Sequence, residues 1–116
     1  MFSKNLVAAS VKPLLLSLLA DGEMYGYEII QRVQDLSNGK IRWTASKLYP
    51  LLHQLENERL VEAFWQPSES GPDRKYYRLT SKGIKALEAT KRDWLEVNAI
   101  LARLWGSGYT LQPALS

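Results

Sequence analysis

The feature that most constrains the fold is a change of hydrophobic period just past the middle of the chain. Residues 44–58 carry leucines at helical spacing, which predicts a helix with one buried face. Residues 61–65 then alternate like a β-strand, and a turn-rich loop at 67–73 leads to a second strand at 74–79. The leucines of the helix are Leu48, Leu51, Leu52 and Leu55. A helix followed at once by a β-hairpin leaves few compact arrangements.

Two helices and a short strand are expected before this unit. The apolar patterns predict helices over 3–20 and about 25–36, and residues 40–43 are long enough for a short strand. The resulting order is helix, helix, short strand, helix, strand, loop, strand. This order is that of a winged helix-turn-helix, mainly α with a small β-hairpin, in which 44–58 is the recognition helix and 61–79 is the wing.

A long C-terminal helix follows the wing. Thr80 is placed to cap it, and its apolar seam continues to about Leu104. At about 1.5 Å per residue, a helix of about 24 residues is roughly 36 Å long, which exceeds what a small domain covers alone. We therefore divide the chain into a winged helix-turn-helix domain at 1–79, a dimerisation helix at 80–105 and a flexible tail at 106–116.

The distal half of this helix needs an apolar partner. The start of the first helix, upstream of Pro13, is one candidate, and a second copy of the chain is another. A two-fold dimer satisfies both, and it would set two recognition helices about one DNA turn apart. Two copies of Trp94 near the dimer axis would wall a flat pocket for a small aromatic effector, with plain dimer packing as the alternative. The expected interface residues are Leu6, Val7, Trp94, Val97, Leu101 and Trp105.

The distribution of charge favours a polyanionic partner. The net charge is only +3, but eleven of the fifteen Lys and Arg residues lie between residues 40 and 92, and residues 40–55 contain no Asp or Glu. A short helix with a positive, acid-free outer face suits the phosphates and base edges of double-stranded DNA. A solvated basic face is the plainer interpretation. The candidate DNA-binding residues are Arg42, Thr44, Ser46, Lys47, Tyr49, Arg74 and Lys75.

These candidates have different expected roles. Lys47, in the first turn of the recognition helix, is the strongest candidate for a base or phosphate contact. Arg74 and Lys75 are expected to contact phosphate, and Tyr49 is either a phosphate ligand or a partly buried ring beside the second helix. Gly26 permits a close approach, either of another helix or of a phosphate, and close packing is the favoured interpretation.

Composition argues against an enzyme and against a membrane protein. Without cysteine there is no disulfide framework, thiolate metal site or cysteine nucleophile, and a single histidine supports no proton relay. No cofactor or metal is expected. The apolar run at 13–20 is too short to span a bilayer, so the cytoplasm is the default location. The remaining rival is a winged-helix protein-interaction or dimerisation module that does not bind DNA.

Four short sequence motifs occur along the chain in an order that matches one known family. They are Met24–Ile29, Leu48–Leu52 with Leu55 and Glu56, Arg74–Thr80 followed by Gly83, and finally Trp94. Together they resemble the PadR family of bacterial transcriptional regulators, over residues 12–104, and the single C-terminal helix is similar to the smaller branch of that family. The resemblance implies a sequence-specific, homodimeric repressor whose recognition helix enters the major groove, with release by a small aromatic ligand as a further expectation.

The resemblance also assigns individual positions. It places Ser46, Lys47 and Tyr49 at recognition-helix contacts. It makes Arg74 and Lys75 the basic pair of the wing, and it puts Trp94 at the dimer interface.

The chain departs from the family pattern at three places. Ser46 and Lys47 stand where members often have Gly-Thr, which alters the expected base preference and adds a cation. Arg59 stands where members usually have glycine, so a left-handed backbone there would be strained. The wing tip at 67–73 contains two acids, which argues against deep insertion into the minor groove.

Overall fold

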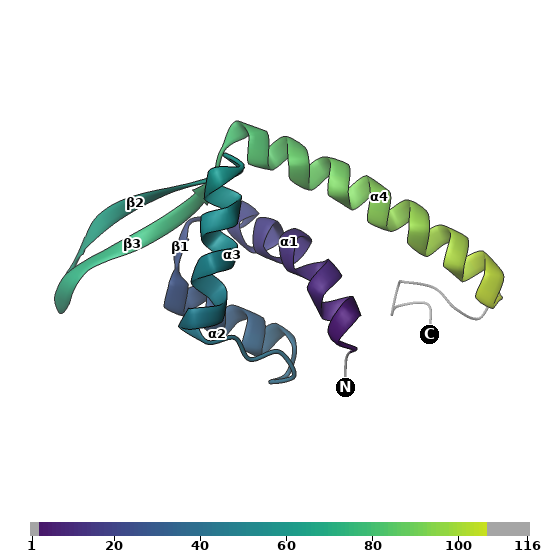
Figure 1. Ribbon diagram of the computed structural model, residues 1–116, viewed down its shortest axis with the longest axis horizontal. Helices are drawn as coiled ribbons and strands as arrows, with labels where there is room; N and C mark the ends of the chain where they lie inside the picture. The colour runs from purple at the N-terminus through teal and green to yellow at the C-terminus, as the bar shows by residue number, and fades with distance from the viewer. Residues whose placement is uncertain (1–2, 107–116) are drawn as a thin grey trace.

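The computed structural model describes residues 3–106, which form four helices and three strands. Most of the tail expected at 106–116 lies outside the described residues. The helices α1, α2 and α3 pack together beside the sheet, the hairpin of β2 and β3 projects on one side, and α4 runs away on the other (Figure 1). The elements are α1 (Lys4–Ala20), β1 (Met24–Tyr25), α2 (Gly26–Leu36), α3 (Ala45–Asn57), β2 (Val61–Ser68), β3 (Gly71–Leu79) and α4 (Ser81–Trp105).

The third strand of the sheet lies earlier in the chain than predicted. The short strand expected at 40–43 does not form; instead β1 pairs antiparallel with β3, giving the strand order β1-β3-β2. Residues 40–43 bond locally, because the Ile41 N–H donates to Ser37 Oγ at 2.9 Å. Trp43 is buried in the core, so this segment is held by its side chain and needs no ladder.

The wing is longer, and its loop shorter, than the sequence predicted. Most of the loop expected at 67–73 belongs to the two strands, which meet at a turn formed by Glu69 and Ser70. The register shifts between Gln66 and Ser68. Pro67 lies at this shift, where its missing N–H cannot interrupt a regular ladder.

Side-chain hydroxyls cap three helices, among them the predicted cap at Thr80. Ser3 Oγ accepts the Leu6 N–H at 3.1 Å, and Thr44 Oγ1 accepts the Lys47 N–H at 3.3 Å. Thr80 Oγ1 accepts the Gly83 N–H at 3.0 Å. Each hydroxyl satisfies one backbone donor that has no partner within its own helix, which fixes where α1, α3 and α4 begin.

The core lies where α1, α2, α3 and the sheet meet. Leucines of α1 and α3 pack against Ile29 and Val33 of α2 and against Tyr77 of β3. Gly26 allows the ring of Tyr49 to approach closely, since a Cβ there would lie 2.9 Å from Tyr49 Cζ. The favoured interpretation of Gly26, close packing, is therefore right.

The first turn of α4 rests on the end of α3. A Cβ at Gly83 would collide with the carbonyl oxygen of Leu60, so this backbone approach requires glycine. The same carbonyl accepts the Thr80 N–H at 3.0 Å, and Thr80 Oγ1 donates to the carbonyl of Arg59 at 2.6 Å. These contacts define a joint, formed by Arg59, Leu60, Thr80 and Gly83, at which α3, the wing and α4 meet.

Arg59, which stands where family members usually have glycine, adopts a left-handed backbone. Its φ is +63°, and it follows the last turn of α3. The Arg59 N–H donates to the Glu56 carbonyl and the Leu60 N–H donates to the Leu55 carbonyl, both at 2.9 Å. This pair of bonds is a Schellman motif, which usually places glycine at the position of Arg59. The motif gives hydrogen-bond donors to two carbonyls at the C-terminal end of α3, but it strains the backbone of Arg59.

We predict that Arg59→Gly stabilises the fold by about 1 kcal/mol, because glycine removes the left-handed penalty of a side chain. Urea denaturation followed by circular dichroism measures the change. Asn57→Gly is the matched control, since that residue is helical, and it is expected to destabilise the protein. Equal destabilisation by both changes would contradict the assignment of strain to Arg59.

Tyr77 is a buried hydroxyl inside this core. Its side chain is fully buried, and Tyr77 Oη has no hydrogen-bond partner among the described residues. Burial raises the pKa of Tyr77 to about 12, with smaller contributions from Glu56 and Tyr49. The neutral phenol is therefore the form that the fold accommodates.

The raised pKa predicts alkaline sensitivity. In the unfolded chain this phenol ionises near its ordinary pKa of about 10, before the folded one does, so stability is lost as the pH rises through that window towards 12. Tyr77→Phe should lose less stability than the wild type between pH 9 and pH 11, measured by urea denaturation. Identical losses in the two proteins would rule out this contribution.

Candidate nucleic-acid interface

The outward face of α3 carries polar side chains and no acid along most of its length. Ser46, Lys47, His53 and Gln54 are exposed, whereas Leu48, Leu52 and Leu55 are buried on the opposite side. The helix contains no Asp or Glu before Glu56. The predicted division of this helix into an apolar and a polar face is confirmed.

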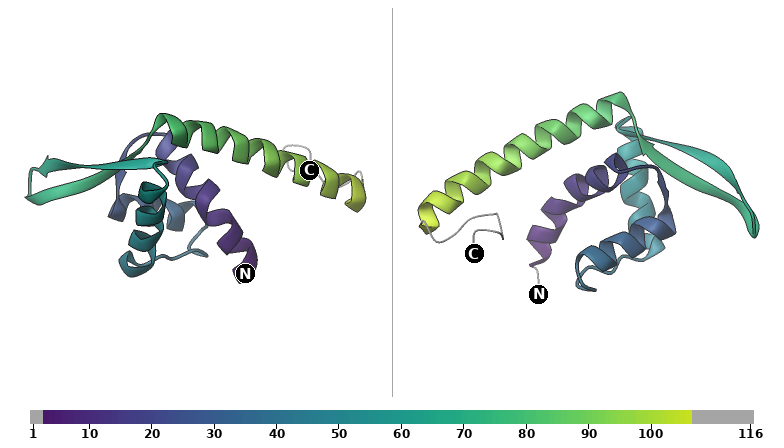
Figure 2. Two further views of the ribbon diagram at one scale, coloured as in Figure 1. Left: turned by 45° about the horizontal axis from the view of Figure 1, so that its top comes forward. Right: turned by 180° about the vertical axis from the view of Figure 1, so that it is seen from behind.

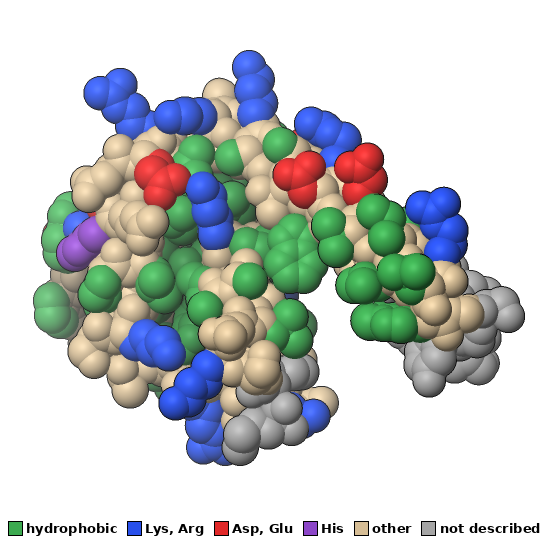
Figure 3. Space-filling model, turned by 45° about the vertical axis from the view of Figure 1, so that its right-hand side comes forward, with side chains coloured by type: hydrophobic (Ala, Val, Ile, Leu, Met, Phe, Trp, Pro, Cys, Tyr) green, Lys and Arg blue, Asp and Glu red, His purple; other side chains and the backbone are tan. Residues whose placement is uncertain are grey.

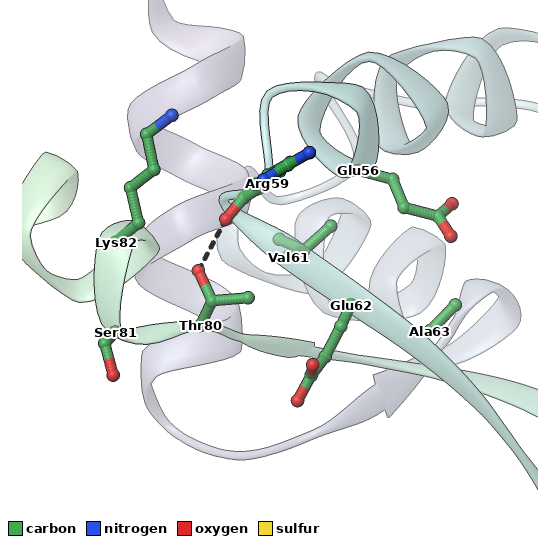
Figure 4. A pocket seen from close by; sticks show the side chains of 8 residues that line it. All are labelled: Glu56, Arg59, Val61, Glu62, Ala63, Thr80, Ser81 and Lys82. Atoms are coloured by element: carbon green, nitrogen blue, oxygen red, sulfur yellow. Dashed lines mark hydrogen bonds between the residues drawn. The ribbon is translucent and has the colours of Figure 1, made fainter.

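The two acids at the C-terminal end of α3 have different surroundings. Glu56 lines a shallow hollow between α3, β2 and the start of α4, as does Glu62 of β2 (Figure 4). Glu58 lies next to the outward face, because its Oε2 accepts a hydrogen bond from Gln54 Nε2 at 3.3 Å. Glu58 Oε1 accepts a hydrogen bond from Lys12 Nζ at 3.0 Å. This bond lowers the pKa of Glu58, so the pair stays ionised and the acid is matched by a cation from α1.

At the start of α3, Thr44 caps the helix, whereas the cationic side chain of Lys47 is exposed. Thr44 Oγ1 caps the helix and lies 3.0 Å from Ser46 Oγ, so these two hydroxyls are engaged with each other. Lys47 is exposed beside a groove between α1 and α3, whose other lining residues include Lys4 and Val7. A mobile ammonium group at this position can reach an anion outside the protein.

Two other candidate DNA-binding residues, Tyr49 and Arg42, make contacts within the protein. Tyr49 is half-buried against Gly26, so its ring serves the packing of α2 on α3. Arg42 Nε donates to the Gly39 carbonyl at 3.0 Å, which fixes the side chain at the end of the α2–α3 loop. The remaining guanidinium donors of Arg42 are available at an exposed position.

The two faces of the wing differ in character. The inner face continues the sheet surface that packs on the helices, and the outer face is the opposite one. Successive strand residues alternate between them, and the register pairs residues of the same face. Inner-face residues are Val61, Ala63, Trp65, Lys75 and Tyr77; outer-face residues are Glu62, Phe64, Arg74, Tyr76 and Arg78.

The predicted basic pair of the wing is therefore divided between the faces. On the outer face Arg74 Nη1 donates to Tyr25 Oη at 3.0 Å, and its guanidinium lies 4.5 Å from the centre of the Tyr25 ring. On the inner face Lys75 lies directly opposite Trp65, with Nζ 5.7 Å from the centre of the Tyr77 ring. Arg74 and Lys75 do not form one patch.

Aromatic and cationic side chains alternate across the outer face. Tyr76 contacts Tyr25 edge-on at 5.3 Å between ring centres and stacks near Phe64 at 5.9 Å. The Arg78 guanidinium lies 4.5 Å from the centre of the Phe64 ring and pairs with Glu62 at 2.8 Å. These contacts tie β1, β3 and β2 together.

Trp65 was not among the sequence candidates. Its side chain is 64% exposed, although the alternation of 61–65 puts it on the same face as the buried Val61. Alternation alone predicts burial for Trp65. Trp65 is exposed because the hairpin carries it past the edge of the core, and the alternation pattern does not give the length of the hairpin.

The distal half of α4 presents the apolar seam expected from the sequence. Val97 is 54% exposed and Trp105 is 60% exposed, whereas Leu87, nearer the domain, is only 3% exposed. Trp94 is partly exposed and Leu101 is half-buried. Two further views show α4 extending past the compact domain on the side where α1 begins (Figure 2).

The start of α1 belongs to the same side of the molecule. Leu6 is 50% exposed and Val7 is half-buried. Hydrophobic side chains line both sides of a hollow between α4 and the body of the domain (Figure 3). The predicted interface residues of α4 are thus at least partly exposed, whereas Val7 also lines the groove between α1 and α3.

The part of the chain that the structure describes contains neither a membrane-spanning helix nor a candidate metal site. Within residues 3–106, no helix is both long and apolar enough to cross a membrane. The same residues contain no cluster of His, Asp or Glu side chains that could hold a metal ion.

Comparisons with known proteins agree with this architecture. A PadR-like regulator of Bacillus cereus is 28% identical, with a TM-score of 0.79 over 90% of this chain and 99% of that one. A transcriptional regulator of Clostridium thermocellum is 25% identical, with a TM-score of 0.78 over 89% and 97%. An uncharacterised protein of Lysinibacillus sphaericus is 30% identical over 87% of this chain and 93% of its own length.

The family relationship rests on the DNA-binding half of the molecule and the start of α4. The model of the transcriptional regulator PadR-like family matches residues 15–89, which include α2, α3 and the wing. This chain belongs to the PadR-like family of transcriptional regulators.

Proposed function

We propose that the chain is a sequence-specific repressor that binds duplex DNA as a homodimer and is released by a small aromatic ligand. The observation that carries the DNA part is the outward face of α3. That face has an exposed ammonium at Lys47 and hydrogen-bonding groups at Ser46 and His53. Acids follow only at the C-terminal end of the helix, where Glu58 is paired with Lys12. Such a face suits a helix that lies in the major groove.

Individual residues take different roles in this proposal. Lys47 and Ser46 contact base edges or the neighbouring phosphates, and Thr44 orients them by capping the helix. Arg42, Arg74 and Lys75 supply phosphate contacts, which set affinity and salt dependence. Tyr49 supports the recognition helix from behind, because its ring is packed on Gly26.

Lys47→Ala is expected to weaken binding to a promoter-derived duplex about tenfold and to lower the salt slope by about one. Fluorescence anisotropy at two salt concentrations, with generic duplex in parallel, measures both. Lys85→Ala is the charge-matched control, since Lys85 is exposed on α4, and it should change affinity less than twofold.

Two results would count against the DNA proposal. If the wild-type chain bound no duplex even at low salt, the non-specific electrostatic attraction would be missing, and a protein-interaction module would become the better description. If Lys47→Ala and Lys85→Ala had equal effects, α3 would not be the recognition helix.

The apolar surface around α4 supports the dimer. Trp94, Val97 and Trp105 expose large hydrophobic side chains along one side of a helix that extends past its own domain. Contiguous apolar surface of this kind commonly marks a protein interface. A two-fold arrangement would let α4 and the start of α1 from each copy cover one another. Repression then requires only that the bound dimer occupy promoter DNA.

Val97→Glu is expected to raise the dimer dissociation constant at least tenfold, because it buries a charge in the proposed interface. Sedimentation velocity over a range of concentrations measures it. Ala99→Glu is the matched control: it adds the same charge two residues later, on another side of α4, and should leave the dimer intact. A monomeric wild-type chain would refute the dimer.

The same two variants test the ligand. A flat apolar pocket between two copies of Trp94 exists only in the dimer, so a planar acridine-type compound should quench Trp94 fluorescence in the wild type and in Ala99→Glu. It should not do so in Val97→Glu, and Trp94→Leu should abolish the signal. Quenching that survives in the monomer would place the ligand elsewhere.

A further inference from the structure

The wing carries a large apolar side chain that neither the core nor the proposed dimer uses. Trp65 is 64% exposed on β2, whereas Trp43 is buried and Trp94 and Trp105 belong to α4. An exposed tryptophan in the stem of a projecting hairpin contributes little to the packing of the domain. Its position therefore points to a partner outside the protein.

The residue opposite Trp65 is a cation. Lys75 lies directly opposite it on the inner face of the wing, and the next pair towards the core is Ala63 with Tyr77. The acid nearest along β2, Glu62, lies on the outer face and is paired with Arg78. The inner face thus presents an indole and an ammonium group side by side. Two acids flank them: Asp73 lies two residues from Lys75 towards the tip, and Glu56 of α3 lies at the base beside Val61 and Ala63.

This inner face is continuous with the side of the recognition helix. Tyr77, on the same face, lies close enough to Tyr49 and Glu56 of α3 to be influenced by both. The hairpin reaches outward from the C-terminal end of α3 (Figure 1). A duplex whose groove held α3 would meet the inner face of the wing next.

The tip of the wing has the opposite character. Glu69 forms the turn, and Asp73 lies beside the register shift near Pro67. Both carboxylates would repel phosphate. The cationic and apolar groups lie in the stem, so the charge pattern favours contact there and disfavours contact at the tip.

We propose that Trp65 and Lys75 together bind the sugar–phosphate backbone of duplex DNA beside the recognition helix, through the stem of the wing. This inference rests on the proposed DNA binding and adds to it. The indole packs on a deoxyribose and its Nε1–H donates to a phosphate oxygen, while the Lys75 ammonium pairs with the adjacent phosphate. Neither group reads a base edge, so the contact is independent of sequence.

The test compares Trp65→Thr with Gln66→Thr. Threonine suits a strand, and Gln66 is the next residue of β2 but lies on the other face. Trp65→Thr is expected to weaken binding to promoter-derived and generic duplexes by the same factor of about ten, and Gln66→Thr by less than twofold. Circular dichroism checks that both variants fold, and fluorescence anisotropy gives the affinities.

A second measurement does not depend on lost affinity. Duplex DNA should quench the tryptophan fluorescence of the wild type, and Trp65→Phe should remove that quenching while the protein still binds. If the wild type binds and Lys47→Ala weakens it, but neither Trp65 variant has an effect, the wing contact is wrong and the proposed function stands. If the wild type binds no duplex, the result contradicts both the wing contact and the proposed DNA-binding function.

Discussion

The joint at Arg59 and Leu60 is the constraint on which the rest of the structure depends. The Leu60 carbonyl accepts the N–H of Thr80, and the first turn of α4 presses so close to it that Gly83 admits no side chain. The preceding residue, Arg59, carries backbone strain where the chain passes from the end of α3 to the start of β2 in three residues. Recognition helix, wing and long helix are therefore held to one another through backbone contacts, which vary little with side-chain motion.

Much of this architecture could be predicted because it follows from local rules. The caps at Ser3, Thr44 and Thr80, the leucine face of α3 and the seam of α4 all reflect spacing along the chain. The third strand could not be found in this way. Met24 and Tyr25 form a strand only because β3 offers them an edge, whereas residues 40–43, which look like a strand, are held by Trp43 and Ser37.

The candidate site was harder to predict than the fold. The family resemblance treated Arg74 and Lys75 as one basic pair, yet adjacent residues in a strand send their side chains to opposite faces. Trp65 was passed over because alternation cannot tell where the core ends. The division of Arg74 and Lys75 follows from strand alternation, which is local, whereas the exposure of Trp65 depends on how far the hairpin extends past the core and is not encoded in any single window of residues.

Because α4 is fixed at the joint, a small rotation at its base produces a larger displacement at its far end. The helix has 25 residues, so it is roughly 37 Å long, and a rotation of about 5° at one end displaces the other by about 3 Å. Because α3 is held to the base of α4 and not to its far end, in the proposed dimer a small change in how the two copies of α4 cross would change the separation of the two copies of α3. Such a shift is comparable to the rise of one base pair along the DNA axis, about 3.4 Å.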